Sequence, residues 1–133
     1  MDTMTIIAIL AASVAAQILG GLWYSQSVFG KMWTKEMKFT KAKLAKVDMK
    51  TPIVVMFLTN IVTATILWWL QLATSAGTIG KALSLGLAVW IGFTATVQLG
   101  GVLWEMKTLK WYAINAGHSL VSLLLMSAIL FYL

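Results

Sequence analysis

The sequence predicts an all-α integral membrane protein that crosses the bilayer four times. Four apolar stretches, at residues 4–24, 53–72, 82–104 and 111–133, fill almost all of the 133-residue chain. The hydrocarbon core of a bilayer is about 30 Å thick, and about 20 apolar helical residues cross it. Charged residues make up only 11% of the chain, against about a quarter in soluble domains. We therefore expect residues 1–133 to form a single four-helix membrane domain.

The ten lysines are spread unevenly over the connections between these stretches. Seven lie in the loop 31–50, two lie in the turn 105–110, and only Lys81 lies in the remaining connection. Cytoplasmic loops of membrane proteins carry an excess of lysine and arginine. We therefore expect this loop and turn in the cytoplasm, both termini outside, and the protein in the cell (inner) membrane. The lysines are also expected to attract anionic lipid headgroups, whereas nothing in their pattern indicates a nucleic-acid partner.

Sequence features at the ends of the apolar stretches and in the segments between them also predict local structure. The first stretch is preceded by Asp2 and by no positive charge, so we expect a retained helix and not a cleaved signal peptide. The basic loop 31–50 is predicted to form short amphipathic helix, with Thr40 capping its second half. Pro52 falls in the first turn of the second helix, where a missing N–H is tolerated. The small and polar residues 73–80 are typical of a turn.

The third stretch repeats residues of the first. With a shift of 81 positions (98 − 17), four residues match without a gap: Gln17 with Gln98, Gly20 with Gly101, Leu22 with Leu103, and Trp23 with Trp104. The second and fourth stretches each carry one asparagine, Asn60 and Asn115, at similar distances from their expected cytoplasmic ends. We therefore predict two tandem, parallel helical hairpins related by a pseudo-twofold axis along the membrane normal.

Two motifs resemble those of a known family. The first is Gly20-Gly21-Leu22-Trp23-Tyr24-Ser25 followed by Phe29-Gly30-Lys31-x-Trp33, and the second joins Glu105-Met106-Lys107-Thr108-Leu109-Lys110 to Ile114-Asn115-Ala116-Gly117-His118 and Val121-Ser122-Leu123. Together they resemble the bacterial and archaeal membrane protein family catalogued as domain of unknown function 1761, over the full length of the chain. Gln26 stands where that family often has proline. The resemblance implies four membrane helices and no assigned activity.

Polar residues inside the stretches gather in the expected cytoplasmic halves. The candidates for a binding site are Gln17, Asn60, Gln98, Glu105, Asn115 and His118. Because an unpaired amide in lipid costs several kcal/mol, we expect these side chains to face the interior of the bundle. Two interpretations stay open: hydrogen bonds that only hold the helices together, or a polar cavity facing the cytoplasm. One histidine and one acid are too few for a metal site, and neither a metal nor a cofactor is expected.

The first functional hypothesis is a small transporter or channel that works as a homo-oligomer, because four short helices enclose little volume. The chain is similar in size to small multidrug transporters, but Gln17 stands where such proton-coupled exporters have an acid in their first helix. The alternative is a non-catalytic membrane scaffold or partner subunit that uses the basic loop 31–50. We expect no enzyme, because the chain has no cysteine, no paired carboxylates and no His-Glu-x-x-His motif.

Overall fold

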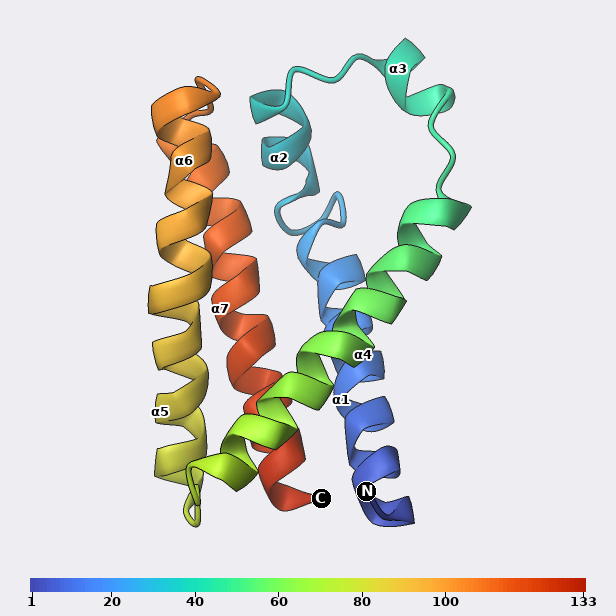
Figure 1. Cartoon of the computed structure of the whole chain (residues 1–133). Helices are drawn as coiled ribbons and strands as arrows, with labels where there is room; N and C mark the ends of the chain where they lie inside the picture. Colours follow the sequence, from blue (N-terminus) through green and yellow to red (C-terminus); the bar gives the residue numbers. More distant parts are fainter.

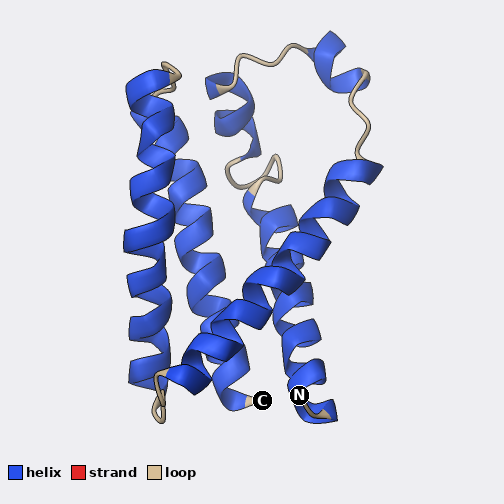
Figure 2. Cartoon of the chain, viewed as in Figure 1, coloured by secondary structure: helices blue, strands red, loops and turns tan.

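The computed structural model describes residues 1–133 and contains helices but no strands (Figure 2). The elements are α1 (Thr3–Trp23), α2 (Gly30–Glu36), α3 (Lys41–Ala45), α4 (Lys50–Ala73), α5 (Ile79–Val89), the π-helical segment η1 (Trp90–Ala95), α6 (Thr96–Trp104) and α7 (Leu109–Tyr132). Because α5, η1 and α6 form one continuous helix, four helices are long and apolar enough to cross a membrane. This confirms the predicted class.

Side-chain caps determine where four of the helices begin. Asp2 Oδ1 accepts a hydrogen bond of 2.8 Å from the backbone N–H of Thr5 at the start of α1. Thr78 and Thr108 cap α5 and α7 in the same way, and Thr40 caps α3 as expected. The hydrogen bonds from Thr5 also lower the pKa of the Asp2 carboxyl, because they stabilise its ionised form.

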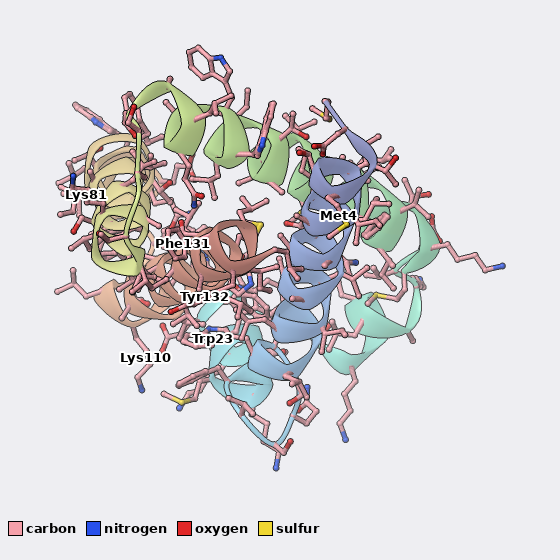
Figure 3. The ribbon with its side chains drawn as sticks, turned by 90° about the horizontal axis from the view of Figure 1, so that it is seen from below. Met4, Trp23, Lys81, Lys110, Phe131 and Tyr132 are labelled. Carbon is pink, nitrogen blue, oxygen red and sulfur yellow. The ribbon has the colours of Figure 1, made fainter.

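Helix α7 lies at the centre of the bundle. It packs against α1, α4 and the continuous helix α5–η1–α6, and also against the short α2. Seen along the bundle, α7 with Phe131 and Tyr132 lies between α5 with Lys81 and α1 with Met4 (Figure 3). Both termini and the α4–α5 turn lie at one end of the bundle, and α2, α3 and the α6–α7 turn lie at the other (Figure 1).

Helix α4 crosses the bundle obliquely. It packs against α1 and α7, and its C-terminal end meets α5, whereas its N-terminal half diverges from α6 (Figure 1). Pro52 lies in its first turn, as expected. The divergence leaves the two halves of the bundle unequal: the half near the termini is closed by α4, and the half near α2 is not.

The core is built mainly from small side chains. One face of α1 carries the buried residues Ala8, Ala12 and Ala16, which pack with Leu67 of α4 and Met126 of α7. Many of the large apolar side chains instead point outward and are exposed. This arrangement suits a surrounding of lipid, since burying apolar surface gains little there and close packing of helices drives their association.

The two glycines of α6 have different neighbours, and this difference gives a test of how α6 packs against α7. A Cβ added at Gly101 would lie 2.5 Å from Cη2 of Trp111, whereas a Cβ at Gly100 would meet nothing within 4 Å. We predict that Gly101→Ala lowers the free energy of unfolding by about 1–3 kcal/mol, because the Trp111 ring must shift as a whole.

The neighbouring substitution Gly100→Ala is the matched control, and it should leave stability unchanged or raise it by up to about 1 kcal/mol through helix propensity. Unfolding in mixed detergent micelles, followed by circular dichroism, measures both variants. Equal losses of stability in the two variants would contradict the packing of Trp111 on Gly101.

Candidate functional site

A cavity of about 430 Å³ lies between α4 and the continuous helix α5–η1–α6, with α7 as its floor. It occupies the half of the bundle near α2, where α4 diverges from α6. The lining residues are Tyr24 from the end of α1; Met56, Thr59, Asn60 and Thr63 from α4; Thr94 and Gln98 from η1 and α6; and Trp111, Asn115, His118, Ser119, Ser122, Leu123 and Met126 from α7. Four of the six candidate residues therefore line one cavity.

On the α4 side, the candidates Gln17 and Asn60 are bonded to each other. Asn60 Nδ2 donates to Gln17 Oε1 at 2.9 Å, and Gln17 Nε2 donates to the backbone carbonyl of Ile53 at 3.1 Å. Gln17 lies behind Asn60 and is not itself part of the lining. Both its amide atoms have partners, so Gln17 joins α1 to α4 and supports Asn60 at the cavity wall.

On the opposite side, Gln98 is only half paired. Its Nε2 donates to Ser119 Oγ at 3.2 Å, and Ser119 Oγ in turn donates to the backbone carbonyl of Asn115. Gln98 Oε1 is buried and has no hydrogen-bond partner. Since most buried polar atoms in folded proteins are paired, this oxygen is an acceptor that the protein itself leaves open.

Asn115 is held by the end of α1. The hydroxyl of Tyr24 donates to Asn115 Oδ1, which joins α1 to α7 at the end of the cavity nearest α2. The ring of Tyr24 packs edge-on against Trp33 of α2, with 5.5 Å between ring centroids. The position of Asn115 therefore depends on α1 and, through Tyr24, on α2.

His118 lies among aromatic rings in the cavity wall. Its ring centroid is 5.2 Å from that of Tyr24 and 6.1 Å from that of Trp23. Its Nε2 is directed toward α1, because a Cβ added at Gly20 would lie 3.4 Å from this atom, at about van der Waals contact. This nitrogen is buried and, like Gln98 Oε1, has no partner.

Glu105 does not join the other candidates. It is the C-terminal cap of α6, it is exposed, and it lies outside the cavity lining. The amide side chains also do not form one closed network across the four helices: Gln17 pairs with Asn60, but Gln98 pairs with Ser119 and Asn115 with Tyr24. No group of three or more His, Cys, Asp or Glu side chains is placed to hold a metal ion.

Trp111 is a lining residue that is not among the six candidates. Its ring packs on Gly101 and lines the cavity. The signal that identifies it is helical spacing, because Trp111 lies four residues before Asn115 and therefore shares its face of α7. Met126 lines the deep end of the same α7 face.

The family described as "Protein of unknown function (DUF1761)" matches residues 7–131. The chain belongs to this family. The matched region includes the whole cavity lining and all six candidate residues. No curated protein and no solved structure matches the chain, so the family assignment brings no activity with it.

The two glutamines give a test that separates structural pairing from an open site. We predict that Gln17→Leu lowers the free energy of unfolding by about 0.6–2 kcal/mol, because it leaves Asn60 without its partner. Gln98→Leu should change stability little or raise it, because it removes a buried oxygen that has no partner and one long hydrogen bond.

Both variants are measured by the same detergent unfolding, with equal helical content as the control for folding. If Gln98→Leu costs as much stability as Gln17→Leu, then Gln98 acts as structural glue and the interpretation of an open acceptor is wrong.

Proposed function

We propose that this member of the family is a small transporter or channel whose substrate occupies the cavity between α4 and α6. The supporting observation is the cavity itself, whose wall carries the uncharged polar side chains of Asn60, Gln98, Asn115 and His118. Behind this wall, Gln98 Oε1 and His118 Nε2 are buried without a partner. A bundle that used its polar groups only for helix association would pair them with each other. A catalytic role is not proposed, because the lining contains no carboxylate.

We propose that the cavity faces the cytoplasm. The argument is the distribution of lysine: residues 31–50 and 105–110 carry nine of the ten, and both segments lie at the end of the bundle nearest the cavity. The termini then face outward from the cell (inner) membrane. The lysines of the loop 31–50 would also bind anionic lipid headgroups, which is the feature that a scaffold role, the second candidate function, would use.

We propose that the two hairpins, α1–α4 and α5–η1–α6–α7, derive from one duplicated unit. In each of them the glutamine of the first helix bonds to a polar side chain of the second: Gln17 to Asn60, and Gln98 to Ser119. The matching tryptophans show how far the two units have diverged. Trp23 donates its indole N–H to Ile114 O, whereas Trp104 is 86% exposed.

We propose that subunits associate through the outer face of α5–η1–α6. This face carries a row of small residues at intervals of four: Ser84, Ala88, Gly92, Thr96 and Gly100. A Cβ added at Gly92 or Gly100 would meet nothing within 4 Å, so this row is free within the subunit, whereas the comparable row on α1 is buried. Small residues allow the backbones of neighbouring helices to approach closely.

The absence of cysteine makes this interface testable by cross-linking. We predict that Ala88→Cys, in the middle of the exposed row, forms a disulfide-linked dimer in membranes under mild oxidation, because two copies of the row would face each other. Val14→Cys, on the exposed face of α1, is the matched control and should stay monomeric. Equal cross-linking of the two variants, or of neither, would contradict this interface.

The transport proposal is tested by the permeability of vesicles. We predict that vesicles containing the protein admit at least one solute from a panel of urea, glycerol, small amides and potassium chloride faster than protein-free vesicles. The variants Gln98→Leu and Ser119→Leu should return the rate toward that of empty vesicles, because the first makes the cavity wall apolar and the second places apolar bulk in the cavity. Stopped-flow light scattering measures the rates.

Val97→Leu is the control for these variants, because Val97 is 71% exposed on the outer surface of the same helix. If no solute enters faster than in empty vesicles, or if the cavity variants conduct as well as Val97→Leu, the transport proposal fails. Binding to anionic vesicles that depends on the loop lysines would then favour the scaffold role.

A further inference from the structure

We propose that the cavity takes a small, uncharged ligand that combines a planar apolar part with an N–H or O–H donor. This inference rests on the same site as the proposed function, but it concerns binding and not movement across the membrane. It follows from three properties of the lining: its lack of charged side chains, the incompletely paired amides of Gln98 and Asn115, and the apolar side chains that surround them.

The first property argues against a charged ligand. No Asp, Glu, Lys or Arg lines the cavity, and the imidazole of His118 is its only basic group. The lysines lie in the loop and the turns outside it. A carboxylate or an ammonium group that entered from water would lose hydration without gaining an ion partner, and an unpaired buried charge is far more costly than a neutral polar group.

The second property specifies the polar end of the ligand. Gln98 lines the cavity, its Nε2 is engaged with Ser119, and its Oε1 is buried without a partner. A ligand reaches this oxygen only when the Gln98 side chain turns toward the cavity, and it must then supply a donor. Across the floor of the cavity, the Oδ1 atom of Asn115 is taken by Tyr24, which leaves the amide N–H groups of Asn115 to donate to an acceptor. A ligand with a donor and an acceptor side by side, as in an amide, matches both.

The third property specifies the remainder of the ligand. Trp111, Leu123 and Met126 lie on the same face of α7 as Asn115 and line the cavity with it. The ring of Trp111 is fixed by its contact with Gly101 and offers a flat apolar surface. A planar ring fits such a wall, and pockets that combine a few placed polar groups with apolar and aromatic walls are typical sites for small organic molecules.

Three probes of the same shape separate these requirements: benzamide, benzamidinium and benzoate share a phenyl ring and a planar head, and they differ in charge. We expect calorimetric titration of the protein in lipid nanodiscs, at about pH 8 where a free imidazole is neutral, to show saturable binding of benzamide. Benzamidinium and benzoate should bind at least about tenfold more weakly. Empty nanodiscs correct for partitioning into lipid.

Two variants connect this binding to Gln98. Gln98→Leu should abolish the binding of benzamide, and Val97→Leu should leave it unchanged. Gln98→Glu should invert the preference toward benzamidinium, because a carboxylate would then stand where the open acceptor was. Equal or tighter binding of a charged probe by the native protein, no saturable binding of benzamide, or benzamide binding that survives Gln98→Leu would overturn the inference.

The calorimetric result and the vesicle result can fail separately. Binding of benzamide that depends on Gln98, without flux of any solute, would retain the ligand class and overturn the transport proposal. Flux that depends on Gln98, without binding of benzamide, would retain transport and overturn the ligand class.

Discussion

The backbone carbonyls of α7 accept hydrogen bonds from side chains of the three long helices around it, and the rest of the bundle depends on these bonds. Trp23 of α1 donates its indole N–H to Ile114 O at 3.0 Å, Trp90 of η1 donates to Ala116 O at 2.8 Å, and Gln71 of α4 donates to Ser127 O at 2.9 Å. In lipid these donors have no water as an alternative partner, so each bond fixes a helix against α7. Together they set the rotation of α7 and so turn the face with Asn115 and His118 toward α4 and α6.

The sequence predicted the four membrane helices and the residues that would face inward, because hydropathy and the 3.6-residue period depend on one helix at a time. It did not predict which residues would meet, since that depends on the tilt and rotation of one helix against another. Asn60 and Asn115 occupy comparable positions in the sequence, yet Asn60 bonds to a glutamine and Asn115 to Tyr24. The oblique path of α4 also has no local signal. Glu105 is a second example. It directly follows the last residue of α6 and lies outside the cavity lining, and the sequence pattern did not show where this helix would end.

The two interpretations of the polar residues, structural pairing and a binding site, concern different glutamines. Gln17 has partners for both amide atoms and lies behind the cavity wall, whereas Gln98 lines the cavity with one atom unpaired. Under the proposed duplication, one copy of a structural pair would be sufficient to hold α1 and α4, and the other would be free to change its partner. The π-helical segment lies just before Gln98 on the same continuous helix. Such segments change the direction of the residues that follow them, which offers a physical reason why Gln98 meets Ser119 and not Asn115.

The wall formed by α4 contributes shape more than recognition. Thr59 donates its hydroxyl to Met56 O, and Thr63 donates to Thr59 O, so these hydroxyls are used within the helix itself. Apart from the Asn60 amide, the side chains left to address a ligand are therefore on the opposite wall and the floor, at Gln98, Asn115 and His118. A solute that enters between α4 and α6 would meet methyl groups, the Met56 thioether and the Asn60 amide on one side and the amides of Gln98 and Asn115 on the other. Selectivity would then depend on Asn60 and on α6 and α7, whose relative positions the Trp111–Gly101 contact fixes, and a change of the α4 threonines to valine would alter access more than choice of ligand.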